Sequence, residues 1–180
     1  MKSVLISIQP KWCELIASGK KTVEVRKTKP KLEIPFKAYI YETKDKKFEN
    51  IGVHWENGRD FIHNGGKVIG EFVCDYIGFT GWFRTPDDPL WDDVFCEESC
   101  LTSSELYKYS GGKNFYELHI SDLVIYDNPK ELNYFCRNGE CKKCGWFDEG
   151  RCIKIDSLND INKHRVIRAP QSWCYVEDGE

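Results

Sequence analysis

Residues 3–27 read SVLISIQPKWCELIASGKKTVEVRK, and this stretch decides the fold of the N-terminal third. The β-branched run at residues 2–8 predicts a short strand. Pro10 favours the first turn of a helix, because the backbone N–H that proline lacks would have no partner there. Gly19 predicts the end of that helix. One face of the helix is apolar and consists of Trp12, Leu15 and Ile16.

A second strand is predicted over residues 22–26. Apolar and polar residues alternate there, which is typical of a strand with one buried face and one outward face. Val23 and Val25 are expected to point toward the core. The opposite, outward face carries Thr22, Glu24 and Arg26.

Later strands are predicted from β-branched and aromatic runs between turn signals. A short helix is expected at residues 103–109, with Ser103 or Ser104 as its N-cap. Many unevenly spaced strands with few short helices indicate an α+β fold, a small mixed β-barrel flanked by short helices, in one domain spanning residues 1–180. The expected strands are Phe36–Tyr41, Lys67–Phe79 with a bulge at Gly70, Phe115–Tyr126 and Val166–Val176.

Charge is distributed unevenly along the chain. The net charge of -3 and the pI near 5.9 argue against a uniformly basic nucleic-acid coat. Residues 1–47, however, carry twelve Lys and Arg against five Asp and Glu, whereas residues 81–105 carry seven acidic side chains and only one basic one. The N-terminal third can therefore form an anion site even though the net charge of the whole chain is negative. Residues 44–66 are expected to form a surface excursion, and residues 81–102 an irregular acidic segment.

The cysteine content and the N-terminal sequence point to the cytosol. The apolar stretch at the N-terminus is too short for a secretory signal, and no run approaches the roughly 18 apolar residues that a membrane helix needs. Nine cysteines in a chain without an export signal favour reduced thiols or metal ligands over disulfides. We therefore expect a cytoplasmic protein with no membrane partner.

Residues 7–27 contain Gly19, Lys21, Glu24 and Arg26 in the spacing Gly-x-Lys-x-x-Glu-x-Arg. Placed after a predicted strand and a capped helix, this pattern resembles the signature of the ASCH domain family. Three later segments also resemble ASCH strands: KVIGEFVCDYI (67–77), FYELHISDLVIYDNPKEL (115–132) and APQSWCYVE (169–177).

The resemblance implies a PUA-like barrel with a basic cleft for RNA, a nucleotide or a modified nucleoside, bound by Lys21, Glu24 and Arg26. The chemistry of these residues agrees with that implication. Lys21 and Arg26 supply positive charge and donors for a phosphate or a base carbonyl, and Glu24 is suited to accept from a base N–H or to hold Arg26. The alternative is a solvent-exposed Glu24–Arg26 pair on a strand, worth about 0–1 kcal/mol.

One ASCH subfamily that this segment resembles deacylates N4-acetylcytidine with a Lys, a nucleophilic Thr and a Glu. Its Lys matches Lys21, its Thr falls on Glu24, and its acid is expected near Glu105. A carboxylate replaces a hydroxyl nucleophile poorly. A hydrolase acting on a modified nucleoside therefore remains an alternative function, with Lys21 and Glu24 as catalytic candidates and Glu24 as a general base for water.

A cysteine cluster predicts a structural zinc site inside an insertion at about residues 134–155. CRNGECKKCGWFDEGRC, residues 136–152, has the spacing Cys-x4-Cys-x2-Cys-x7-Cys. Four thiolates fill a tetrahedral Zn²⁺ and leave no position for water. His164 is a candidate replacement for the last cysteine, and uncoordinated thiols or two disulfides are the alternative. The predicted zinc ligands are Cys136, Cys141, Cys144 and Cys152.

Exposed aromatic rings are further candidates for contact with unpaired bases. Trp55, Trp82 and Trp91 lie on expected loops, and Tyr107 and Tyr109 on the expected helix. The favoured interpretation of the whole sequence is a domain that binds RNA or a nucleotide-like ligand. The alternatives are the hydrolase and a protein-interaction adaptor that uses the zinc segment and the acidic residues 84–105.

Overall fold

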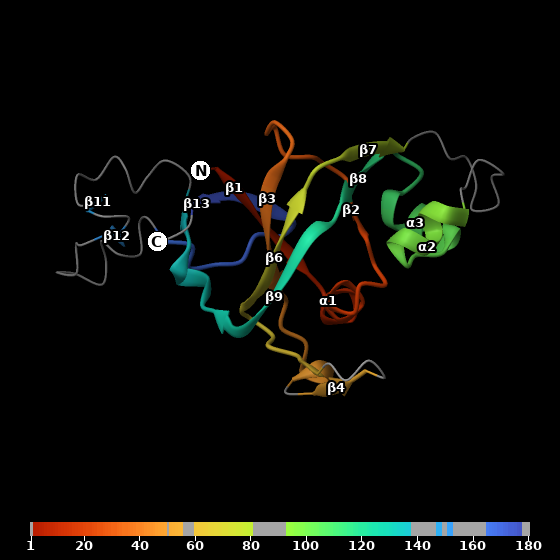
Figure 1. The fold of residues 1–180 in the computed structure, drawn as a ribbon. Helices are drawn as coiled ribbons and strands as arrows, with labels where there is room; N and C mark the ends of the chain where they lie inside the picture. Colours follow the sequence, from red (N-terminus) through yellow and green to blue (C-terminus); the bar gives the residue numbers. More distant parts are fainter. Residues whose placement is uncertain are drawn as a thin grey trace.

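The computed structural model describes residues 2–49, 51–55, 60–80, 93–137, 147–148, 151–152 and 165–177 (Figure 1). Its helices are α1 (Pro10–Ala17), α2 (Asp93–Ser99) and α3 (Ser103–Ser110). Its strands are β1 (Ser3–Ile8), β2 (Val23–Arg26), β3 (Phe36–Glu42), β4 (Gly52–His54), β5 (Asp60–Ile62), β6 (Val68–Cys74), β7 (Ile77–Thr80), β8 (Phe115–His119), β9 (Ser121–Lys130), β10 (Cys136–Arg137), β11 (Phe147–Asp148), β12 (Arg151–Cys152) and β13 (Trp173–Glu177).

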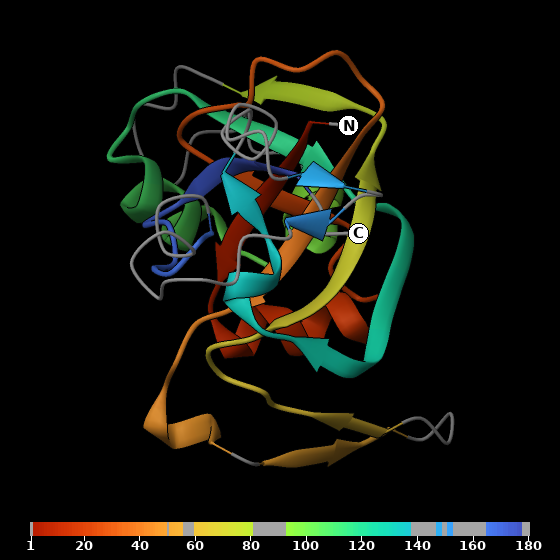
Figure 2. The same cartoon turned by 90° about the vertical axis from the view of Figure 1, so that its left-hand side faces the viewer.

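A six-stranded mixed sheet forms the centre of the fold, in the order β10-β13-β1-β3-β6-β9. The first strand, β1, lies parallel to β3 and antiparallel to β13. All six of its residues are buried, which explains why its sequence is almost continuously apolar rather than alternating. The helix α1 returns the chain over this sheet and buries Cys13, Ile16 and Ala17 (Figure 2).

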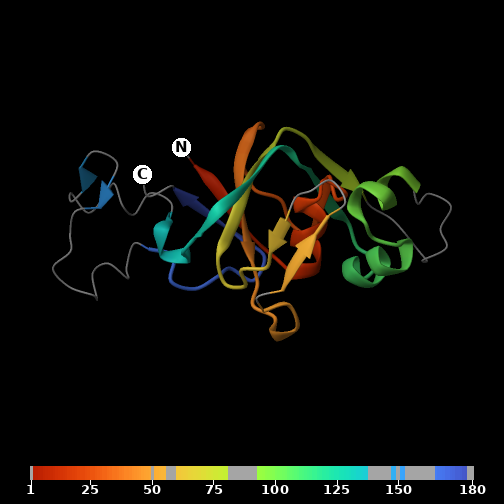
Figure 3. The ribbon, with the colours of Figure 1, turned by 60° about the horizontal axis from the view of Figure 1, so that its bottom comes forward.

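A second, three-stranded antiparallel sheet has the order β2-β8-β7. On one of its faces, Val25 and Phe115 pack with Leu106 of α3 in a small separate core. Figures 1 and 3 show α2 and α3 together beside this sheet. The other face of β2, which carries Glu24 and Arg26, points toward the central sheet, where the candidate site lies.

Two strands predicted as single runs are each divided between the sheets. The run Lys67–Phe79 becomes β6 in the central sheet and β7 in the three-stranded sheet, and Phe115–Tyr126 becomes β8 and β9. The predicted irregularity at Gly70 is present, because the register with β9 shifts there. A Cβ at Gly70 would lie 2.4 Å from the Val124 carbonyl oxygen, so only glycine allows this close approach.

The acidic segment at 81–102 is partly helical, which corrects the expectation of an irregular segment in its second half. α2 occupies Asp93–Ser99, while residues 81–92 lie outside the described part of the chain. The N-cap of α3 is Thr102 rather than Ser103 or Ser104. The Thr102 side chain accepts from the Glu105 backbone N–H, and the Glu105 carboxylate accepts from the Thr102 N–H, which completes a capping box.

The polar segment 44–66 contains the hairpin β4–β5, which lies below α1 in Figure 2. Two of its side chains are buried rather than at the surface, namely Phe61 in the main core and His63. Trp55 stacks on Phe61 with ring centroids 6.0 Å apart and is partly buried against the main core.

The mixed α+β class is confirmed, with more of the described residues in strands than in the three helices beside them. Over the described residues the hydrogen-bonded ladders form separate sheets, and β6 and β8 bring the two larger ones into contact. Within this part of the chain, no helix is long and apolar enough to cross a membrane.

Candidate functional site

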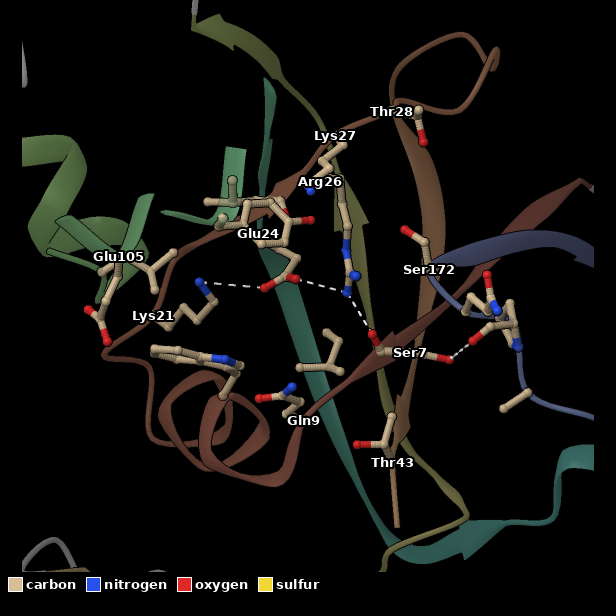
Figure 4. Close-up of a pocket in the computed structure, with 18 of the residues that line it drawn as sticks. Ser7, Gln9, Lys21, Glu24, Arg26, Lys27, Thr28, Thr43, Glu105 and Ser172 are labelled. Carbon is tan, nitrogen blue, oxygen red and sulfur yellow. Dashed lines mark hydrogen bonds and ion pairs between the residues drawn. The ribbon is translucent and has the colours of Figure 1, made fainter. Parts of the chain in front are cut away.

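A cavity of about 1130 Å³ opens between the two larger sheets (Figure 4). Its walls come from the end of β1 and the start of α1, from β2, from α3 and from residues 169–172. All three ligand residues predicted from the sequence, Lys21, Glu24 and Arg26, line this cavity. The structure therefore brings the predicted set together in one place.

The Glu24 carboxylate lies between the two cations (Figure 4). Its Oε1 is 2.9 Å from Arg26 Nη2, and its Oε2 is 3.5 Å from Lys21 Nζ. Each cation also donates to a backbone carbonyl, since Lys21 Nζ is 2.7 Å from the Ser99 oxygen and Arg26 Nη2 is 2.7 Å from the Ser7 oxygen. We call these three side chains the charged triad.

The charged triad is buried, with relative exposures of 2% for Lys21, 6% for Glu24 and 8% for Arg26. The sequence pattern predicted the inward and outward faces of β2 correctly, but the outward face is covered by segments far away in the chain. The interpretation as a solvated surface pair is therefore wrong. A buried ion pair differs from an exposed one because removing one partner leaves an uncompensated charge in a poorly hydrated site.

Burial also affects the protonation of groups around the triad. It lowers the pKa of the Lys21 ammonium, and the adjacent Glu24 carboxylate counteracts part of that lowering. Burial raises the pKa of the Tyr109 phenol, while the Arg26 guanidinium opposes the rise. Arg26 Nε is buried and makes no hydrogen bond within the described residues.

Two aromatic rings stand at the cavity, Trp12 from α1 and Tyr109 from α3. Lys21 Nζ lies 5.3 Å from the centroid of the Trp12 ring, and Lys27 Nζ lies 5.1 Å from that of Tyr109. Tyr109 was predicted as a possible cleft contact, whereas Trp12 was interpreted only as a packing residue. Tyr107 packs in the small core beneath α3 and does not line the cavity.

The charges around the cavity are predominantly positive. Four basic side chains line it against two acidic ones. One of the acids is Glu105, the residue expected near the acid of the hydrolase subfamily. Its carboxylate is engaged in the α3 cap, where the Thr102 N–H donates to it at 2.9 Å and lowers its pKa. The lining basic residues are Lys21, Arg26, Lys27 and Lys108.

Sequence reasoning missed the polar wall opposite β2. Ser7, Gln9 and Thr43 line the cavity, as do residues 169–172. The Ser7 hydroxyl donates to the Pro170 oxygen at 2.6 Å, and the Ser7 N–H donates to the Ser172 oxygen at 2.9 Å. The signal was present, because Ser7 interrupts the apolar run from Val4 to Ile8. The position of its partners, 163 residues away in the case of Pro170, has no local signal.

The predicted zinc ligands are only partly within the described residues. Cys136 is buried on β10, which pairs with β13, and Cys152 is the last residue of β12. Cys141, Cys144 and the alternative ligand His164 lie outside the described part of the chain, as do Trp82 and Trp91. Among the residues that are described, no group of three or more His, Cys, Asp or Glu is placed to hold a metal.

Known proteins share the fold. The ASCH domain family model matches residues 6–177. Solved structures of the ASCH protein from Zymomonas mobilis superpose on nearly the whole chain at 19% identity: one has a TM-score of 0.57 and covers 97% of this chain and 87% of that one. A tyrosine-to-phenylalanine mutant of that protein has a TM-score of 0.59 with 99% and 93% covered, and a serine-to-alanine mutant 0.58 with 98% and 89%.

A search of curated proteins finds no match to the sequence. The solved structures support the fold, and the family model supports the membership independently of them. ASCH domains are PUA-like domains that in general bind RNA. With nearly its whole length matched, including the charged triad and residues 169–172, the chain belongs to the ASCH domain family.

Proposed function

We propose that the cavity binds a nucleotide, either as a free small molecule or as one unpaired nucleotide of an RNA. The observation that carries this proposal is the charged triad at the wall of a roomy cavity between two aromatic rings. Unpaired bases stack on aromatic side chains and hydrogen-bond along their edges. Glu24 and Arg26 supply an acceptor and donors for a base edge, and the excess of basic residues suits a phosphate.

The arrangement favours binding over hydrolysis. Glu24 occupies the position of the nucleophilic Thr in the hydrolase subfamily, and its carboxylate is engaged by two cations. The two contacts engage both carboxylate oxygens, one of which a general base would need to accept a proton from water. Thr22, the neighbouring hydroxyl in the sequence, is not among the described residues that line the cavity.

Titration with the four nucleoside 5′-monophosphates and with N4-acetylcytidine tests the proposal. We expect saturable binding of at least one of them by calorimetry, and no release of acetate from N4-acetylcytidine by mass spectrometry. Trp12→Ala should weaken binding by about 5- to 150-fold, the equivalent of about 1–3 kcal/mol for one stacked base. Tyr76→Ala, at an exposed ring away from the cavity, is the matched control. Rapid deacylation, or no binding of any of the five compounds, would contradict the proposal.

The affinity for an anionic nucleotide should depend on pH through the charge of Lys21. An ammonium is charged below its pKa, and burial lowers the pKa of this one. Affinity should therefore fall as the pH rises through the lowered pKa of Lys21, at a lower pH than for an exposed lysine. Kd measured from neutral pH upward checks this. Lys21→Arg should flatten the profile, because a guanidinium keeps its charge up to about pH 12; an equally steep profile in that variant would assign the effect to another group.

We also propose the structural zinc site. The hairpin β11–β12 pairs Cys152 with Phe147, which follows Cys144 by three residues in the sequence. The buried Cys136 lies at the start of the same segment. Four cysteine thiolates would hold the ion in a closed tetrahedral site that contributes to folding and offers no position for substrate.

Elemental analysis should find close to one zinc per chain. Cys141→Ser together with Cys144→Ser should abolish binding and lower the melting temperature, because the binding energy of a structural zinc is folding energy. Cys100→Ser is the control, since this cysteine follows α2 in the sequence and its thiol donates to the Lys20 carbonyl oxygen. Protein purified without chelator that contains no zinc, with all four thiols reactive, would refute the site.

A further inference from the structure

An exposed aromatic ring lies in the same row of the three-stranded sheet as Arg26. Arg26 of β2 is opposite Tyr116 of β8, which is opposite Phe79 of β7. Directly opposite residues of antiparallel strands share one face, so the three side chains form a row across two strand spacings, about 10 Å. Phe79 is 58% exposed, and its ring centroid lies 5.4 Å from that of Tyr116.

A basic loop at residues 27–34 lies beside this row and adjoins the cavity. Lys27 and Thr28 belong to the cavity wall and stand next to Arg26 in Figure 4. Lys29 Nζ lies 5.4 Å from the centroid of the Tyr116 ring. Residues 29–34, together with Ile77, then line a second, open hollow of about 620 Å³. The loop thus lies between the cavity and a neighbouring hollow, and its lysines are exposed between the two.

The backbone of the basic loop is held by β13. Trp173 Nε1 donates to the Thr28 carbonyl oxygen at 3.2 Å and to its hydroxyl at 3.1 Å. The Lys31 N–H donates to the Tyr175 hydroxyl at 2.7 Å. These contacts fix the positions from which Lys27, Lys29 and Lys31 extend, which lowers the ordering cost of binding a charged ligand there.

We propose that a single-stranded RNA chain leaves the cavity over this basic loop, with the adjacent base stacked on Phe79. This inference rests on the proposed function and specifies the ligand as an RNA strand rather than a free nucleotide. Sequence-tolerant recognition of single strands needs a positive path with aromatic platforms beside it, and the row provides both. A protein partner would need acidic side chains opposite three separate lysines, whereas the phosphates of one strand reach them in succession.

A short mixed-sequence oligoribonucleotide and the nucleoside monophosphates, titrated in parallel, test the inference. Phe79→Ala should weaken binding of the oligomer by about 5- to 150-fold and leave mononucleotide binding unchanged, because one base loses its stacking partner. Phe79→Trp should retain tight binding. Lys29→Ala should make the logarithmic salt slope for the oligomer shallower by about 0.7. Tyr76→Ala, 62% exposed and outside the row, is the aromatic control.

The outcomes separate the two proposals. If mononucleotides bind but Phe79→Ala leaves oligomer affinity unchanged, the strand path is wrong and the cavity remains a nucleotide site. A Phe79→Ala variant that loses mononucleotide and oligomer affinity equally also overturns the path, because Phe79 would then act through the cavity. If neither ligand class binds the parent protein, both proposals fail.

Discussion

His63→Ala is expected to lower the free energy of unfolding by about 3–5 kcal/mol, because it removes a hydrogen-bond partner from a buried carboxylate and leaves a cavity where the ring packed. His63 Nδ1 lies 2.5 Å from Glu42 Oε1, and the two side chains are 1% and 0% exposed. The other Glu42 oxygen accepts from the Asn64 N–H. Without the imidazole, this completely buried carboxylate retains one hydrogen bond among its described contacts.

Packing adds to this loss. The His63 ring meets Phe48 and Phe61 edge-on, each at a centroid distance of 5.0 Å, and its Nε2 lies 3.6 Å from the Glu14 carboxylate on α1. His63 therefore joins the segment 44–66 to β3 and α1. An alanine there would leave a void between two phenylalanine rings as well as a carboxylate oxygen that has lost its hydrogen-bond partner.

Urea unfolding of His63→Ala and His54→Ala compares a buried and an exposed member of the same segment. His54 pairs with Asp60 on the hairpin, where the side chains are 75% and 71% exposed. Exposed pairs contribute only about 0–1 kcal/mol, so His54→Ala should unfold almost like the parent. Equal losses in the two variants would show that Glu42 does not depend on His63 for its burial.

Glu24→Ala is expected to destabilise the protein by a similar amount, about 3–5 kcal/mol. It leaves Lys21 and Arg26, 2% and 8% exposed, as like charges without their shared carboxylate. Glu24→Gln should lie between the parent and Glu24→Ala, because an amide oxygen still accepts from Arg26 but carries no charge. Thermal unfolding with circular dichroism measures all three proteins.

A double-mutant cycle identifies the cause of that loss. Lys21→Met removes one cation, so adding it to Glu24→Ala should cost less than it does in the parent protein. Glu71→Ala is the control for removing a carboxylate from a more exposed pair, since Lys37 and Glu71 are 39% and 20% exposed. Additive losses for Lys21 and Glu24 would mean that the two side chains act independently.

The fold of the N-terminal third was predictable because its signals are local. The strand predicted at 2–8, the helix beginning at Pro10 and the strand predicted over 22–26 each depend on neighbouring residues, and the structure confirms them as β1, α1 and β2. The division of Lys67–Phe79 between two sheets was not predictable. An apolar run indicates a strand, but the sheet it joins depends on partners such as β8 and β9, which come from other parts of the chain.

In the candidate site too, the features set by neighbouring residues were predictable and those set by distant segments were not. The spacing of Lys21, Glu24 and Arg26 predicted a shared site, and the structure brings all three to one cavity. Their burial was missed, because the covering segments, α3 and residues 169–172, are distant from β2 in the sequence. Trp12 packs against the main core, as its apolar helical face predicts, but it also lines the cavity, which the sequence did not indicate. A tryptophan on an apolar helical face looks the same in sequence whether it meets the core or a cavity.

The pairing of β1 with β13 makes the order of synthesis relevant to the pocket. Ser7 contacts Pro170 and Ser172, and β1 cannot gain its antiparallel neighbour until the ribosome has released the chain well beyond them. Contacts this distant in sequence form late and slowly. A nascent chain that ends before residue 169 would expose one edge of β1 and lack one wall of the cavity. We therefore expect such a chain not to bind the ligand, and binding to begin only once residues 169–177 have been synthesised.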